Sequence, residues 1–328
     1  MSLLIGFVVA FAVTYLLGKV LIPVLRRLKA GQSIKEIGPT WHMSKQGTPT
    51  MGGLMFIAGI GAAVLIAGWQ QMRQGVYTHL LVFLFALVFG AIGYVDDYEK
   101  VKHHHNTGLT APQKFLLQLA ASIAFVVLLR HLGVLNPNLY IPFVGKELIL
   151  PWPAYMVFAA FVMVATVNAV NITDGVDGLA TGVTIPVALF YVAAAVWCGR
   201  MELGVFGAAL AGGLAAFLIY NFHPAKVFMG DTGSLFLGGA VCGMAFALNI
   251  PLVIPMIGLI YVAEVLSDII QVAYFKLTHG KRIFRMAPLH HHLEMGGWSE
   301  VKLFSVFSLI TALMCVLAFW GVMARMTI

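Results

Sequence analysis

Runs of about twenty apolar residues recur ten times along the chain, and this recurrence is what most restricts its fold. The runs cover residues 2–25, 51–69, 78–95, 115–135, 152–172, 178–198, 202–222, 233–250, 252–275 and 301–322. About 20 apolar residues in a helix cross the hydrocarbon core of a bilayer. Because 60% of the 328 residues are hydrophobic and only 10% are charged, the water-soluble and disordered classes are excluded. The sequence predicts an all-α polytopic membrane protein of about ten transmembrane helices, forming one domain over residues 1–328.

Lysine and arginine are unevenly divided between the loops. Fourteen of the twenty lie in the loops that follow the odd-numbered segments. Since cytoplasmic loops carry an excess of these residues, we expect the odd-numbered loops to be cytoplasmic and both termini to be external. The first segment lacks a small-residue cleavage pattern, so we interpret it as a retained helix. Residues 139–150 are too short and too rich in turns to span, and they suit a small external β-hairpin.

Aspartate and glutamate also gather on the predicted cytoplasmic side, where nine of the thirteen lie. The rule that orients basic residues does not predict this, so a functional site is the natural cause. Asp96 and Asp97 close the third segment. They are either a solvated helix end or an acid pair that handles Mg²⁺ or phosphate, because Mg²⁺ binds carboxylates together with substrate phosphates.

Two further loops on this side carry polar side chains in unusual density. The loop after segment five holds four acids and amides within ten residues and no Lys or Arg: Asn168, Asn171, Asp174 and Asp177. Polar turn residues are the alternative explanation. Before segment eight, Asp231 lies between two glycines, a setting that suits a phosphate site, a helix N-cap or both.

The loop after segment nine contains three consecutive histidines, residues 290–292. Zinc sites prefer spaced ligands and no cysteine is nearby, so donors to a pyrophosphate are the better interpretation. A second triplet, His103–His105, is interpreted as a solvated surface run. Within segment nine, Glu264, Asp268 and Gln271 form one helical stripe, and carboxylates inside a membrane helix are functional candidates.

Five motifs taken together resemble the phospho-N-acetylmuramoyl-pentapeptide-transferase family, within the polyprenyl-phosphate N-acetylhexosamine-1-phosphate transferase superfamily. They are TPTMGG (48–53), VDDYEK (95–100), NAVNITDGVDGL (168–179), NFHPAKVFMGDTGS (221–234) and PLHHHLE (288–294). The resemblance implies transfer of phospho-MurNAc-pentapeptide from UDP-MurNAc-pentapeptide to undecaprenyl phosphate, giving lipid I and UMP for peptidoglycan, with Mg²⁺ as cofactor. It also implies a homodimer, a broken ninth helix, and a place in the bacterial cytoplasmic membrane with the active site on the cytoplasmic face.

The same resemblance assigns roles to sixteen residues. It implies that Asp231 binds Mg²⁺ and belongs to the catalytic set, together with Asp96, Asp97, Lys100, Lys114, His290 and His291. The positions that it places around the nucleotide and its sugar are Lys45, Thr50, Asn171, Asp174, Gly175, Asp177, Asn221, Phe228 and Gln271. It gives no role to His103–His105.

Other functions fit the sequence less well. A transporter should carry its polar residues near the bilayer midplane, whereas here they collect at one face. A membrane scaffold would not need five polar loops, and we expect no nucleic-acid partner. A sister transferase that uses UDP-GlcNAc is the main alternative. For the reaction itself we favour direct attack by the lipid phosphate, with Asp97 as base or positioning group rather than as a covalent nucleophile.

Overall fold

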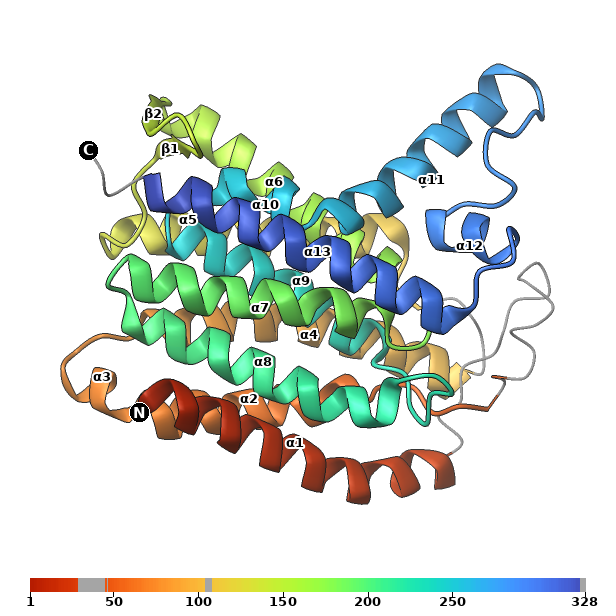
Figure 1. Cartoon of the computed structure of the whole chain (residues 1–328), viewed down its shortest axis with the longest axis horizontal. Coiled ribbons are helices and arrows are strands. Elements are labelled where there is room, and N and C mark those ends of the chain that lie inside the picture. Colours follow the sequence, from red (N-terminus) through yellow and green to blue (C-terminus); the bar gives the residue numbers. More distant parts are fainter. Residues whose placement is uncertain (29–44, 46, 104–107, 325–328) are drawn as a thin grey trace.

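The chain folds into a bundle of long helices, seen in a computed structural model that describes residues 1–28, 45, 47–103 and 108–324. In Figure 1 most of these helices run side by side along the long axis. The long helices are α1 (Ser2–Arg27), α2 (Gly53–Ala67), α4 (Thr78–His103), α5 (Ala111–His131), α6 (Trp152–Thr173), α7 (Leu179–Trp197), α8 (Met201–Asn221), α9 (Gly230–Ala247), α11 (Leu259–Leu277) and α13 (Glu300–Met323). Of the His103–His105 run, only the backbone of His103, at the end of α4, falls within the described residues.

Each of the ten predicted apolar segments coincides with a helix, but not every helix is long enough to cross a membrane alone. Within the described residues, seven helices are long and apolar enough to cross a membrane. A bent pair of helices, counted as one span, raises the number to eight. Helix α2 has only 15 residues. Helix α9 begins with Gly230 and Asp231 and is not among the seven. The protein therefore has seven or eight candidate spans, while the ten spans and the side of the termini stay predictions.

Helix α9 lies at the centre of the bundle. Every residue from Thr232 to Ala247 is buried, and the helix packs against α2, α4 and α6. Two of its glycines permit this packing. A Cβ at Gly238 would lie 2.5 Å from the Cα of Val167 in α6, and one at Gly239 would lie 3.0 Å from the Cα of Ala86 in α4. In a bilayer the hydrophobic effect does not drive helices together, and small residues instead let helix backbones approach closely. The glycines of α9 thus allow neighbouring helices to enclose it.

The ninth segment is broken, as predicted. It consists of a 3-10 turn, η2 (Pro251–Val253), a short helix, α10 (Ile254–Ile257), and α11, with a bend of 78° at the break. Gly258 stands between the two helical parts. Helix α11 consequently leaves the bundle obliquely, and the chain returns from its far end to the short α12 (Leu289–Glu294), at the right of Figure 1.

A small antiparallel hairpin lies at the opposite end of the bundle from α12 (Figure 1). Its strands are β1 (Asn138–Ile141) and β2 (Lys146–Ile149), in the register Asn138 to Ile149 and Ile141 to Lys146. The Tyr140 hydroxyl donates a 2.7 Å hydrogen bond to the carbonyl of Gly321 in α13. The predicted hairpin is therefore confirmed and is attached to the bundle. The short helix α3 (Trp69–Arg73) lies at the same end.

The described parts of the loops after the odd-numbered segments meet at the end that carries α12, as Figure 1 shows. The first and fourth of these loops pair through their backbones. Phe228 N donates to Pro49 O at 2.9 Å, and Gly52 N donates to Phe228 O at 2.8 Å. Gly53 N donates in turn to Met229 O at 3.0 Å. This pairing joins the start of α2 to the start of α9.

Candidate active site

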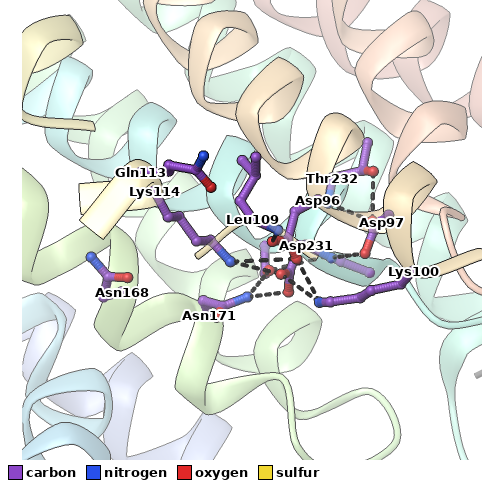
Figure 2. Close-up of polar contacts among 12 residues, drawn as sticks. Asp96, Asp97, Lys100, Leu109, Gln113, Lys114, Asn168, Asn171, Asp231 and Thr232 are labelled. Carbon is purple, nitrogen blue, oxygen red and sulfur yellow. Dashed lines mark hydrogen bonds and ion pairs between the residues drawn. The ribbon is translucent and has the colours of Figure 1, made fainter. Parts of the chain in front are cut away.

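Three carboxylates from two helices meet at this end of the bundle (Figure 2). Asp96 and Asp97 come from the last turns of α4, and Asp231 comes from the first turn of α9. One oxygen of each lies within 4.8 Å of the other two. The approach depends on Gly93, because a Cβ there would overlap the backbone of Asp231. The three predicted acids therefore form one cluster, which we call the acid cluster.

Asp97 holds the beginning of α9. Its Oδ1 accepts a hydrogen bond from Asp231 N at 3.1 Å, and its Oδ2 accepts from Thr232 N at 2.8 Å and from the Thr232 hydroxyl at 2.7 Å. The first amides of a helix have no partner within the helix and carry the positive end of its dipole. Asp97 is thus a carboxylate cap supplied from another helix. A side chain at Gly230, whose φ is +69°, would meet Asp97 and Thr50.

Two lysines share the carboxylate of Asp231. Oδ2 of Asp231 lies 3.0 Å from Nζ of Lys100 on α4 and 2.7 Å from Nζ of Lys114 on α5. Lys100 also lies 2.5 Å from Oδ2 of Asp96, whose Oδ1 accepts from the amide of Leu109. The lysine side chains are 34% and 17% exposed, so both ammonium groups are partly open to a ligand. Three acids and two lysines leave one net negative charge.

An amide completes the acid cluster. Asn171 Nδ2 donates to Asp231 Oδ1 at 2.8 Å and to Ser234 Oγ at 2.7 Å. Asn168, one turn earlier on α6, instead donates to Gln118 Oε1 on α5. Of the two asparagines on one face of α6, only Asn171 therefore contacts the acids.

Asp174 follows directly after α6, and it is half-buried. Burial raises the pKa of its carboxyl well above the usual range, and the negative charges of Asp231, Asp97 and Asp177 raise this pKa further. A carboxyl group whose pKa is raised in this way, beside a charged cluster, is typical of functional sites.

A second polar cluster joins three loops to the start of α13. Lys45 Nζ lies 2.8 Å from Asp177 Oδ1 and 2.6 Å from Glu300 Oε2. Asp177 Oδ2 also accepts from Ala225 N and lies 3.0 Å from His223 Nδ1. The Asp177 side chain is only 2% exposed, so it needs these partners. The predicted residues Lys45 and Asp177 thus bind each other in this second cluster.

The predicted histidines each have a carboxylate on Nδ1. His290 Nδ1 lies 2.9 Å from Glu264 Oε2, and His291 Nδ1 lies 2.8 Å from Glu294 Oε2. His290 is 1% exposed and packs against Gly175, where a Cβ would overlap its Nε2. The histidine motif therefore meets the loop after α6.

Two residues predicted to bind the nucleotide, Asn221 and Gln271, form their side-chain hydrogen bonds outside the acid cluster. Asn221 is buried, accepts from Thr181 Oγ1 at 2.8 Å and donates to Val227 O at 3.1 Å. Gln271 binds the backbone of residues 283 and 284, accepting from both amides and donating to Phe284 O. In this structure both residues support loops rather than join the acid cluster.

Some residues at the site were not predicted from the sequence. They are Thr232 and Ser234 at the start of α9, and His223 and Glu300 in the second polar cluster. The first two stand in the quoted motif GDTGS, where a hydroxyl one and three residues after Asp231 was the available signal. Nothing in the local sequence marks Glu300 as a partner of Lys45.

The acid cluster fits a hard divalent cation. Its ligand atoms are all carboxylate oxygens, which Mg²⁺ prefers. The oxygens of Asp97 accept from the α9 amides and the Thr232 hydroxyl, so Asp231 and Asp96 are the carboxylates that could hold such a cation. The second polar cluster also groups Asp177, His223 and Glu300, but one of its three ligand atoms is a histidine nitrogen, which suits Mg²⁺ less well than carboxylate oxygen.

Comparison with known proteins agrees with this geometry. A model of glycosyl transferase family 4 matches residues 79–249, which run from α4 to α9. A phospho-N-acetylmuramoyl-pentapeptide-transferase signature matches residues 45–57. The chain is 47% identical over 324 residues to the transferase of that name from Clostridium botulinum (strain Alaska E43 / Type E3), covering 97% of this chain and 96% of the relative.

The chain belongs to the phospho-N-acetylmuramoyl-pentapeptide-transferase family. Two more members show the same extent of similarity. That of Heliobacterium modesticaldum is 48% identical over 318 residues, 95% of this chain and 96% of the relative. That of Staphylococcus carnosus is 44% identical over 315 residues, 95% and 97% of the two chains. The matched regions include Lys45, Thr50 and the whole acid cluster, so the family resemblance and the geometry concern the same residues.

Proposed function

We propose that the protein transfers phospho-MurNAc-pentapeptide from UDP-MurNAc-pentapeptide to undecaprenyl phosphate, giving lipid I and UMP in peptidoglycan biosynthesis. The observation that carries this proposal is the convergence of Asp96, Asp231, Lys100 and Lys114 at one end of a membrane bundle in a member of this transferase family. Acids and lysines held together in this way suit a reaction between two phosphate groups.

The lysines and the acids have different electrostatic roles in this proposal. Lys100 and Lys114 both bind Asp231, and phosphate oxygens of the substrates would compete with that carboxylate for the two ammonium groups. Asp231, with Asp96, would hold Mg²⁺. The bound ion would stabilise negative charge on the pyrophosphate as the transferred phosphorus changes partners.

The contacts of Asp97 support direct attack by the lipid phosphate. One oxygen of that phosphate forms a bond to the β-phosphorus, the bond from the β-phosphorus to the bridging oxygen breaks, and UMP leaves with that oxygen. A phosphomonoester is largely dianionic at neutral pH, so a general base is not required. Both Asp97 oxygens bind the start of α9, which suits a positioning role better than a covalent one. An aspartyl-phosphate trapped without lipid acceptor would contradict this mechanism.

We place the protein in the bacterial cytoplasmic membrane with the acid cluster on the cytoplasmic face. The excess of Lys and Arg in the loops at that end supports this orientation. The proposal treats residues 1–328 as one catalytic domain that acts as a homodimer. Crosslinking in native membranes, read as the mass of the crosslinked species, tests the dimer.

One assay tests the reaction against its main alternative. Purified protein is incubated with Mg²⁺, undecaprenyl phosphate and either UDP-MurNAc-pentapeptide or UDP-GlcNAc, and UMP release is measured. We expect UMP only with the first donor. Release from UDP-GlcNAc alone would identify a sister transferase, and release from neither would contradict transferase activity toward this acceptor.

A further inference from the structure

A carboxylate from inside the broken helix reaches the histidine motif. Glu264 lies on α11 and is 0% exposed, and its Oε2 lies 2.9 Å from Nδ1 of His290 and 3.3 Å from the amide N of the same residue. His290 opens the first turn of α12 and is 1% exposed. The two residues therefore form a fully buried pair that fastens α12 to α11.

The other ring nitrogen of His290 points at the loop after α6. Its Nε2 is buried and has no hydrogen-bond partner among the described residues. A Cβ on Gly175 would overlap this atom, so the ring edge lies against the bare backbone of that glycine. Asn171, four residues before Gly175, donates to Asp231 Oδ1 at 2.8 Å, so this part of the chain begins beside the acid cluster. Nε2 consequently faces the part of the site that adjoins the acid cluster.

A carboxylate on Nδ1 determines what Nε2 can do. It fixes the ring orientation and holds a proton on Nδ1, so Nε2 is the only ring nitrogen left for a ligand. When the ring is charged, Nε2 donates, and the carboxylate supplies the opposite charge. An anionic phosphate oxygen needs such a donor.

The location of Glu264 argues against a role in packing alone. A carboxylate inside an apolar helix is costly, and an apolar side chain would hold α12 against α11 without that cost. Its second oxygen, Oε1, is buried and has no hydrogen-bond partner within the described part of the chain. His291 obtains its carboxylate from Glu294 on the same short helix, whereas His290 depends on a residue from across the loop.

We propose that Glu264 is the positioning residue of His290: it sets the ring so that Nε2 donates to a pyrophosphate oxygen of the nucleotide substrate beside Gly175. This inference rests on the proposed function, because it names the group that meets the pyrophosphate in that reaction. The proposal also assigns a role to the bend at Gly258. The bend turns α11 away from the line of α10 and places Glu264 within hydrogen-bond distance of His290 on α12.

A double-mutant cycle tests the proposal. Glu264→Gln, His290→Gln and the double variant are prepared as full-length protein, and kcat and KM for UDP-MurNAc-pentapeptide are measured by UMP release. We expect Glu264→Gln to lower kcat by about 10–100-fold, as is usual when a partner that orients a functional histidine is lost. In the His290→Gln background the same change should lower kcat by less than about twofold, because Glu264 acts only through the ring.

The controls separate positioning from folding. Glu202→Gln removes another buried carboxylate, one that binds Arg200 at the far end of the bundle, and should leave kcat unchanged. Glu264→Asp retains the charge and should recover part of the activity. If Glu264→Gln is too unstable to assay, the aspartate variant is used in the cycle with His290→Gln.

The outcomes are distinguishable from failure of the proposed function. Wild-type protein that releases no UMP from any donor would refute the proposed reaction; the cycle is then run on UDP affinity, where loss of the Nε2 donor should weaken binding. Wild-type kcat in Glu264→Gln would overturn the positioning role. Equal fold-losses from Glu264→Gln with and without His290 would overturn it as well, since they would show an effect independent of the ring.

Discussion

The carboxylate of Asp97 accepts a 2.7 Å hydrogen bond from the hydroxyl of Thr232, a residue 135 positions later in the chain. The same oxygen accepts from the Thr232 amide, so one acid of α4 holds the first turn of α9. This contact joins the two helices that supply the acid cluster. The positions of Asp96 and Asp231 relative to each other depend on it.

The first prediction concerns this contact. Thr232→Val keeps the shape of the side chain and removes one hydrogen bond to a charged group, a loss of about 1.5–3 kcal/mol. We expect a lower thermal unfolding midpoint and a partial loss of UMP release. Asp97→Ala removes all three bonds and should lower the midpoint further and abolish turnover. An unchanged midpoint in Thr232→Val would show that the hydroxyl does not hold α9.

The second prediction concerns Asp231 and the cation. Asp231→Ala should abolish turnover while the protein stays folded, because this residue is the proposed oxygen ligand of the cation and its loss leaves Lys100 and Lys114 without their shared partner. Folding is checked by gel filtration and by the unfolding midpoint. Chelation of divalent ions should stop UMP release by the wild type, and added Mg²⁺ should restore it. Full activity of the variant would rule out Asp231 as the metal ligand.

The third prediction follows from the raised pKa of Asp174. In the unfolded chain an aspartate ionises near pH 4. In the folded protein ionisation is disfavoured, so this group contributes stability that is fully present below pH 4 and is lost as the pH rises through the raised pKa.

Asp174→Asn replaces the ionisable carboxyl with a neutral amide, so the variant does not lose this stability as the pH rises. At neutral pH we expect the variant to have a higher thermal unfolding midpoint than the wild type, because it carries no carboxyl group to ionise. The difference should vanish near pH 4. Activity should fall, because Asp174 lies in the predicted nucleotide site. A midpoint that is lower than that of the wild type at pH 7 would refute the electrostatic explanation.

The fourth prediction concerns the space between Gly175 and His290. Gly175→Ala introduces a Cβ that overlaps Nε2, so the ring must move away from the loop. We expect kcat to fall at least about tenfold, since displacements of this size at a site are costly. In a His290→Ala background the space is open, and the additional alanine should have little effect. A multiplicative loss in the double variant would place the effect of Gly175 elsewhere.

Much of this architecture could be predicted from local sequence. Apolar runs of about 20 residues have few structures other than a membrane helix, which is why all ten segments coincide with helices. The grouping of acids after the odd-numbered segments likewise predicted that Asp96, Asp97 and Asp231 would share one end of the bundle. The count of spans was less predictable, because α2 ends after 15 residues and α9 begins with the polar site residue Asp231, and apolar composition alone does not give these bounds.

The partner of each polar side chain was decided by the tertiary structure. Gln271, still a predicted nucleotide residue, binds the backbone of residues 283–284, because the path of the chain after α11 brings that backbone within reach of its amide. The bend at Gly258 decides that Glu264 meets His290. Sequence alone determined the helices and the side on which the polar residues gather, because hydrophobicity and charge act over one segment at a time. Which of those residues touch was decided only by the angles and close approaches of helices far apart in the chain, and no local pattern encodes them.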